Sequence, residues 1–189
     1  MNLLAGFFIM DGSLTLKGST FGRAFNNSLG HEGGFVDDPD DTGGATKYGI
    51  SLRTYKKYHP DATSQNIKDM TLDEAKIFYH QYFWLPNRYN EIKNEDLAVK
   101  IFDAAINTGP AQAHLCLQRA LNCVGFKLKE DGRLGDKTLE ALNYTGSPEW
   151  GFAILCAYRS ELAGFYRLLA ETKPKNKKFL NGWLKRAYS

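Results

Sequence analysis

Apolar residues recur at helical spacing through most of the chain, and this pattern predicts a mainly α-helical fold. The first such segment carries Phe21, Ala24, Phe25 and Leu29 on one face of an amphipathic helix. After Leu29 the pattern is interrupted by residues 31–50, which are rich in acidic residues and glycine. We expect at most one small β-hairpin there, near residues 35–50.

Start and stop signals divide the rest of the chain into further helices. Thr71-Leu72-Asp73-Glu74 is a capping box, and the helix that it begins must stop near Pro86. Residues 94–108 sustain an apolar stripe with small residues, which predicts a buried central helix. The sequence signals also predict a short helix over 51–58, a helix beginning at Pro110, a long helix from Ser147-Pro148 to before Pro174, and a last helix over 179–188.

Glu32 is the first candidate for chemistry. It lies three residues after Leu29, so a helix continued to that point would carry its carboxyl on the apolar face, before Gly33 and Gly34 end the helix. Desolvation and the negative end of the helix dipole would both raise the pKa of a carboxyl there. A raised pKa is what a general acid working near neutral pH requires.

The loop that follows supplies the partners of such an acid. Pro39 and the Gly43-Gly44 pair punctuate a turn that can fold back and bring Asp40, Asp41 and Thr46 close to Glu32. A protonated Glu facing an ionised Asp, with a hydroxyl to hold a water, is the equipment of a glycoside hydrolase.

The motif Glu-Gly-Gly, followed by Asp-Pro-x-Asp-x-Gly-Gly-x-Thr-x-x-Gly-Ile, closely resembles glycoside hydrolase family 108. Its members are N-acetylmuramidases with a lysozyme-like fold, found in phage endolysins and bacterial genomes. The resemblance implies hydrolysis of the β-1,4 bond between N-acetylmuramic acid and N-acetylglucosamine in peptidoglycan. No metal-ligand spacing appears in the sequence, and we expect neither a metal nor a cofactor. The resemblance also implies Glu32 as the catalytic acid. We expect Asp41 and Thr46 to complete the catalytic residues, and Asp40, Tyr48 and Asn107 to be candidates for binding the substrate.

The spacing is also similar to that of phage-type lysozymes, in which an Asp and then a Thr follow the catalytic Glu. Asp41 stands nine residues after Glu32, as in that pattern, but Thr46 comes one residue early. The neighbouring Asp40 leaves the identity of the second carboxylate open. This resemblance favours inversion, with carboxyl groups roughly 6.5–9.5 Å apart, over the separation of about 5–5.5 Å in retaining enzymes. The sequence itself leaves the stereochemistry undecided.

Two other functions compete with hydrolysis. The chain could be a non-catalytic peptidoglycan-binding or secretion-associated protein on a lysozyme-like fold, although such a protein would be expected to have lost Glu32. Asp37, Asp38, Asp40 and Asp41 could instead bind calcium, but the glycine and glutamate positions of an EF-hand loop are missing. A solvated acidic turn without a function is a third interpretation, but it does not explain the placement of the glycines and of Thr46.

Asn107 and the aromatic residues call for structural explanations first. Asn107 ends an apolar stripe and needs a partner, which we expect to be the backbone of a neighbouring loop, with a sugar as the alternative. Aromatic residues are dense in one region, at Tyr79, Tyr82, Phe83, Trp84 and Tyr89. Helical spacing makes most of these core residues, and we expect one or two at most to reach the substrate.

The C-terminal half resembles peptidoglycan-binding modules. Leu117-Gln118-Arg119-Ala120-Leu121 precedes a turn that runs from Asp131-Gly132 to Thr138, with a second glycine at position 135. The alternative is that this half only completes a helical fold around the catalytic cleft. We therefore expect an N-terminal extension over 1–19, a muramidase catalytic region over 20–95, and a helical peptidoglycan-binding-like region over 96–189, packed together as one globular unit.

Composition and charge limit the binding partners and the cellular location that the sequence predicts. A net charge of +3 gives no bias towards nucleic acid, and the hydrophobic content of 43% is typical of a globular protein. Three cysteines do not make a disulfide framework, so we expect buried free thiols. The apolar run Leu3–Met10 lacks a basic region and a cleavage site, and it is too short for stable membrane insertion. The sequence predicts a monomer made in the bacterial cytoplasm without a clear signal peptide, which acts at the cell wall after release.

Overall fold

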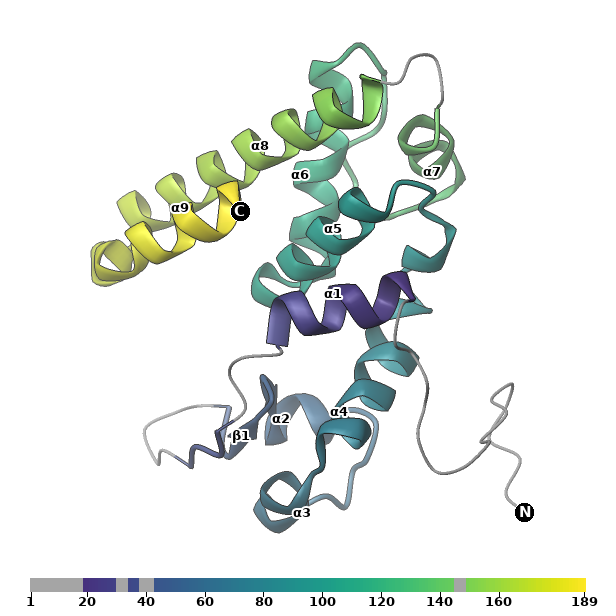
Figure 1. Ribbon diagram of the computed structural model, residues 1–189. Helices are drawn as coiled ribbons and strands as arrows, with labels where there is room; N and C mark the ends of the chain where they lie inside the picture. The colour runs from purple at the N-terminus through teal and green to yellow at the C-terminus, as the bar shows by residue number, and fades with distance from the viewer. Residues whose placement is uncertain (1–18, 30–33, 38–42, 145–148) are drawn as a thin grey trace, which may run out of the picture. The chain divides into compact units, whose positions relative to one another are not determined.

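The computed structural model describes residues 19–29, 34–37, 43–144 and 149–189 (Figure 1). It comprises two compact units, Met1–Phe83 and Trp84–Ser189, each with its own buried core. Within the described residues helices predominate, and β-structure is confined to one hairpin and one isolated bridge. The predicted mainly α class with a small hairpin is confirmed.

Helix α1 (Thr20–Leu29) opens the N-terminal unit. The hydroxyl of Ser19 accepts a hydrogen bond from the backbone N–H of Gly22 at 3.0 Å, which satisfies one of the donors left free at the start of the helix. Phe21, Ala24, Phe25 and Leu29 are all buried, as their spacing predicts. Burying a phenylalanine side chain stabilises a fold by about 1.5–3 kcal/mol, so this face holds α1 in the unit.

After the hairpin the chain forms three short helices: α2 (Leu52–Tyr55), α3 (Ser64–Asp69) and α4 (Leu72–Tyr79). Helix α2 is shorter than the predicted 51–58 segment, because turns replace the helix beyond Tyr55. Helix α3 was not predicted from the sequence. Its N-cap is Thr63, whose backbone N–H donates to Asn66 Oδ1 at 2.8 Å.

The capping box before α4 is confirmed. The backbone N–H of Thr71 donates to Glu74 Oε2 at 2.7 Å, and the backbone N–H of Glu74 donates to Thr71 Oγ1 at 3.2 Å. Helix α4 continues as a π-helical turn, η1 (His80–Trp84), and helical structure stops before Pro86, as expected. Tyr79, Trp84 and Tyr89 are buried, so most of the dense aromatic residues do belong to the cores.

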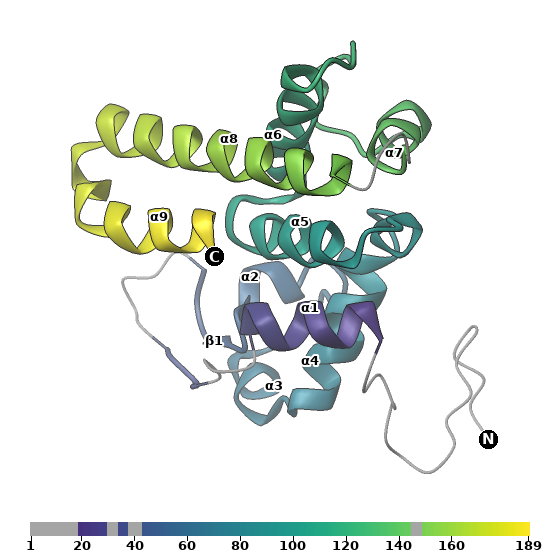
Figure 2. The ribbon, with the colours of Figure 1, turned by 45° about the horizontal axis from the view of Figure 1, so that its top comes forward.

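The C-terminal unit is built from helices. Its elements are η2 (Tyr89–Glu91), α5 (Glu95–Thr108), α6 (Pro110–Cys123), α7 (Asp136–Leu142), α8 (Trp150–Thr172), η3 (Pro174–Phe179) and α9 (Leu180–Tyr188). Helix α5 packs on α6, and α6 packs on α8. Figures 1 and 2 both show α9 running back alongside α8.

Helix α5 buries eight of its fourteen residues, as its apolar stripe predicts. Two of the eight are charged, and they hold α9 in place. Lys100 Nζ donates to the carbonyl oxygen of Arg186, and Arg186 Nη2 forms an ion pair with Asp103 Oδ1 at 3.0 Å. Burial lowers the pKa of Lys100 to about 8, because the ammonium loses its hydration.

The cysteine prediction is only partly right. Cys116 is buried, whereas Cys123 and Cys156 are exposed, and all three are free thiols. Cys123 is the last residue of α6, and its sulfur lies 3.9 Å from Glu161 Oε1 at the surface. The seven-residue spacing from Cys116 places both cysteines on one helical face. It does not show how far along the helix that face is covered by neighbouring elements.

Candidate functional site

The glycine-rich motif ends in a tight antiparallel hairpin of β1 (Thr46–Lys47) and β2 (Ile50–Ser51). Thr46 pairs with Ser51, and Lys47 pairs with Ile50. The two turn residues both have positive φ, 50° at Tyr48 and 72° at Gly49. Two-residue hairpin turns of the I′ type require this, and glycine adopts it without strain.

The turn of the hairpin packs against α1 and α4. A Cβ at Gly49 would lie 3.0 Å from Leu29 Cδ2 and 3.0 Å from the Tyr79 hydroxyl oxygen, so a side chain there would have to displace these groups. The same tyrosine donates its hydroxyl hydrogen to the carbonyl oxygen of Tyr48 at 3.2 Å. These contacts fix the hairpin turn at the C-terminal end of α1, three residues before Glu32 in the sequence.

A second backbone contact closes the motif on itself. Val36 and Thr46 exchange two backbone hydrogen bonds, N–H of Val36 to O of Thr46 at 2.9 Å and N–H of Thr46 to O of Val36 at 2.7 Å. The pairing joins two positions on either side of a sequence segment that contains every aspartate of the motif. The segment that follows the Glu-Gly-Gly sequence is thus held directly beside the candidate threonine.

Thr46 is half-buried, and its hydroxyl donates to the carbonyl oxygen of Gly44 at 3.1 Å. That bond orients the oxygen while its two lone pairs can still accept hydrogen bonds. A hydroxyl held in this way can accept a hydrogen bond from a water molecule and so orient that water.

Tyr48 is two residues beyond Thr46 on the same hairpin, and its ring is half-buried. The ammonium of Lys47 lies 5.4 Å from the centre of this ring, within the range of a cation–π contact. Lys47 is itself tied down, because its Nζ donates to the carbonyl oxygen of Lys68 in α3 at 2.7 Å. Thr46 and Tyr48 therefore lie on the same hairpin, and their roles at the site stay predictions.

Asn107 lies in α5 of the C-terminal unit. Its side-chain Nδ2 donates to the carbonyl oxygen of Asp103, one turn earlier in the same helix, at 2.9 Å. The expected bond to a neighbouring loop is therefore replaced by a bond within the helix. The residue is partly exposed, so a contact with a sugar stays a prediction.

Glu32, Asp40 and Asp41 lie outside the described residues. The expected separation of the carboxyl groups across the loop, and the choice between Asp40 and Asp41, stay predictions for the same reason. Among the described residues no cluster of three or more histidine, cysteine or acidic side chains is placed to hold a metal ion.

The C-terminal motif forms a network around Gln118. Its Oε1 accepts from the backbone N–H of Gly132 at 2.8 Å, and its Nε2 donates to Asp131 Oδ1 at 2.9 Å and to the carbonyl oxygen of Arg133 at 3.0 Å. Sequence reasoning found the motif but not this role of the buried amide. The motif residues are held by one another, which gives them a structural function in the turn.

The turn is also anchored through His114. Its Nδ1 lies 3.2 Å from the carbonyl oxygen of Gly132, and its Nε2 lies 2.9 Å from the hydroxyl oxygen of Tyr89. A carbonyl accepts only, so Nδ1 carries the hydrogen and Nε2 accepts from Tyr89. Burial lowers the pKa of His114 to about 4, which keeps the imidazole neutral.

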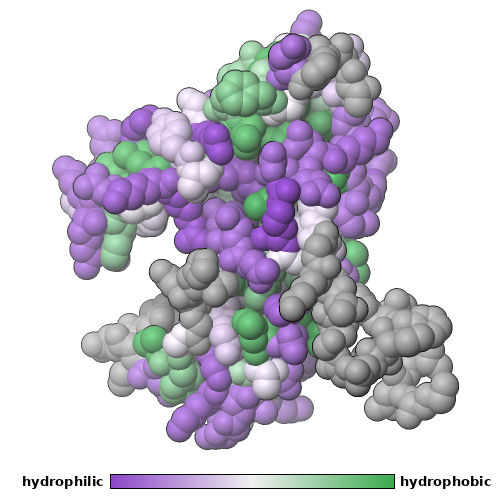
Figure 3. Space-filling view, in the orientation of Figure 1, coloured by the Kyte–Doolittle hydropathy of each residue, from purple (hydrophilic) through white to green (hydrophobic). Residues whose placement is uncertain are grey.

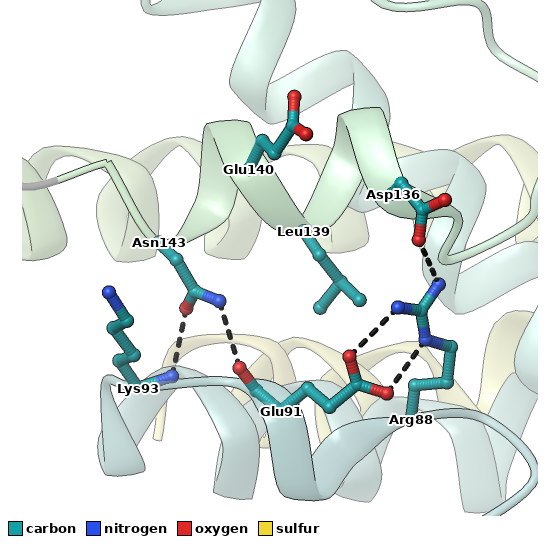
Figure 4. A pocket seen from close by; sticks show the side chains of 7 residues that line it. All are labelled: Arg88, Glu91, Lys93, Asp136, Leu139, Glu140 and Asn143. Carbon is teal, nitrogen blue, oxygen red and sulfur yellow. Dashed lines mark hydrogen bonds and ion pairs between the residues drawn. The ribbon is translucent and has the colours of Figure 1, made fainter.

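An open pocket of about 420 Å³ lies between α7 and the segment that contains η2 (Figure 4). Its polar groups bind one another. Arg88 bridges Glu91, at 2.8 Å, and Asp136, at 2.7 Å. Asn143 accepts from the backbone N–H of Lys93 and donates to the carbonyl oxygen of Glu91, both at 2.8 Å. These bonds hold α7 against the preceding segment. The polar groups of the pocket therefore have a structural role in this unit.

Both halves of the chain match families of known proteins. The family described as "Glycosyl hydrolase 108" matches residues 25–109, and the family described as "Predicted Peptidoglycan domain" matches residues 112–188. The solved structure of Brucella abortus SagA is 26% identical, with a TM-score of 0.63, and the match covers 89% of this chain and 94% of that one. No curated protein matches the chain.

The chain therefore contains a segment that matches glycosyl hydrolase family 108, over residues 25–109, followed by a segment that matches a peptidoglycan domain. It is a glycoside hydrolase whose activity is directed at peptidoglycan, and its action is at the cell wall. In the part of the chain that the structure describes, no helix is both long enough and apolar enough to cross a membrane.

Proposed function

We propose that this hydrolase is an N-acetylmuramidase, which cleaves the β-1,4 bond between N-acetylmuramic acid and N-acetylglucosamine. The observation that supports the proposal is the pairing of Val36 with Thr46, which places the backbone that follows the Glu-Gly-Gly sequence beside a threonine whose hydroxyl has a fixed orientation. The family match spans the whole motif, including Glu32.

In this proposal Glu32 donates its proton to the glycosidic oxygen as the bond from that oxygen to the anomeric carbon breaks. Asp41, or Asp40 in its place, accepts a proton from water as the water oxygen bonds to the anomeric carbon, or stabilises the positive charge that develops there. Thr46 orients the water, and Tyr48 and Asn107 bind the sugar. The products are a new reducing end and a free hydroxyl on the leaving sugar.

The finer assignments belong to the same proposal. The catalytic region is 20–95, and the peptidoglycan-binding-like region is 96–189. The enzyme acts as a monomer and reaches the wall after release from the cytoplasm.

The competing function is a non-catalytic wall binder, which the peptidoglycan-domain match over 112–188 favours. Product analysis separates the two. Purified peptidoglycan is digested with the full chain, reduced with borohydride, and the new ends are identified by mass spectrometry. Reduced N-acetylmuramic acid ends support the muramidase proposal. Reduced N-acetylglucosamine ends, anhydro ends or an unchanged polymer would each contradict it.

A further inference from the structure

The N-terminal unit also contains a pocket. It lies beside the end of α2, and no residue of the motif hairpin lines it. Its volume is about 430 Å³, within the range of about 300–1,000 Å³ that is typical of small-ligand sites. The rings of Tyr55, Tyr58 and His59 and the polar side chains of Asp61 and Asn66 line it. Among the lining residues there is no lysine or arginine.

The rings are held in fixed positions by one another. Tyr58 stacks on Tyr82 with ring centres 4.0 Å apart and 23° between the planes, and the edge of Phe78 meets Tyr58 at 5.6 Å. Tyr55 stacks on His59 with centres 4.3 Å apart. Tyr58 nevertheless remains 41% exposed, so part of its ring is open to the pocket.

The polar side chains offer opposite hydrogen-bonding capacities. Asn66 Oδ1 accepts from the backbone N–H of Thr63 at 2.8 Å and from its hydroxyl at 2.9 Å. A backbone N–H only donates, so this bond fixes the orientation of the amide and leaves the Nδ2 hydrogens to donate outwards. Asp61 is exposed and adds a carboxylate acceptor on the same pocket.

This combination selects a class of ligand. A rigid aromatic surface with a few polar groups fits a ligand that has one apolar face and a rim of hydroxyl or amide groups, and a sugar ring has both. An anionic ligand would meet Asp61 without a cation in the lining to offset the repulsion. The favoured ligand is therefore a neutral sugar.

We propose that this pocket is a carbohydrate-binding subsite that takes an uncharged N-acetylhexosamine unit of a glycan strand. The tyrosine ring packs on the sugar face, Asn66 donates to the acetamido or hydroxyl oxygens, and Asp61 accepts from hydroxyl groups. The choice of a glycan rests on the proposed function, but binding at this pocket requires no catalytic step.

The test is an amide NMR titration of the full chain with the tetramer of β-1,4-linked N-acetylglucosamine. The proposal predicts saturable shift changes centred on residues 55–66. It further predicts that Tyr58→Ala weakens binding by about 3- to 10-fold, the loss expected for one aromatic contact, while Tyr58→Phe binds like the parent.

Asp61→Ala provides a second variant, because the side chain is exposed. It should also weaken binding. The matched control is Tyr144→Ala, which removes another exposed tyrosine with two ring neighbours, Phe126 and Trp150, and should leave the affinity unchanged.

No shift changes at residues 55–66, or an affinity that both Tyr58→Ala and Asp61→Ala leave unchanged, would overturn the subsite. Failure of the muramidase proposal would show instead in the digestion products. The two outcomes are distinguishable because the titration measures binding alone.

Discussion

Leu29 and Gly49 lie against each other, so that a Cβ at Gly49 would be only 3.0 Å from Leu29 Cδ2. The first residue ends α1, and the second is in the turn of the hairpin. This contact joins the end of the helix that precedes the motif to the turn near the end of the motif. A glycine is needed at the turn for two reasons, its positive φ and the lack of space.

Gly49→Ala should therefore destabilise the N-terminal unit. The left-handed backbone costs an alanine about 1–2 kcal/mol, and displacement of Leu29 and Tyr79 adds to that cost. Gly44→Ala is the matched control, because its φ is 70° but its new Cβ would meet only Leu52 at an ordinary 3.6 Å. Urea unfolding should show the larger loss at Gly49, and equal losses would contradict the packing explanation.

Thr46→Val tests the hydroxyl. Valine keeps the branched shape that suits the hairpin but cannot orient water, so kcat should fall by about 10- to 100-fold, the cost of a misplaced reactant. Thr46→Ser keeps the hydroxyl and should retain most of the activity. Thermal unfolding of both variants provides the control: a loss of kcat that follows the unfolded fraction would mean that Thr46 serves only the fold.

The second carboxylate is assigned by comparing three variants. Asp41→Asn should lower turnover more than it weakens binding of peptidoglycan, because the amide cannot accept a proton from water. Asp38→Asn is the control and should have the smaller effect. If Asp40→Asn is the damaging change, the role belongs to Asp40.

His114 should make the C-terminal unit sensitive to acid. Its pKa is about 4 in the fold and near 6.5 when unfolded, so the unfolded state binds more protons between these values. Stability is thus complete above about pH 6.5 and falls as the pH drops towards 4. Urea unfolding at several pH values should show this slope in the parent, and a smaller slope in His114→Gln. Equal slopes would contradict a buried neutral imidazole.

Local signals were enough to predict much of the fold. The apolar face of α1, the capping box at Thr71 and the start of α6 at Pro110 all follow from a few neighbouring residues. The π-helical turn at His80–Trp84 and the helix α3 did not, because tertiary packing outweighs weak local preferences there.

The candidate site was predictable to a similar degree. The motif led to Thr46 and Tyr48 and to their hairpin, because glycine and proline positions determine turns. The aromatic pocket was not recognised, since the spacing of Tyr55, Tyr58 and His59 equally fits a packed helix face. Only the structure shows that Tyr82, from a distant segment, stacks on Tyr58 and leaves part of that ring exposed.

The central claim is that Glu32 supplies the proton for cleavage. The most direct measurement is the clearing rate of a suspension of purified peptidoglycan by Glu32→Gln, beside the parent and beside Glu95→Gln as a control at an exposed glutamate. Glutamine keeps the size of the side chain and removes the transferable proton. The account predicts a normal unfolding transition and a clearing rate at least about 10²–10⁴-fold lower for Glu32→Gln, with Glu95→Gln like the parent. Comparable clearing by Glu32→Gln and the parent would contradict it.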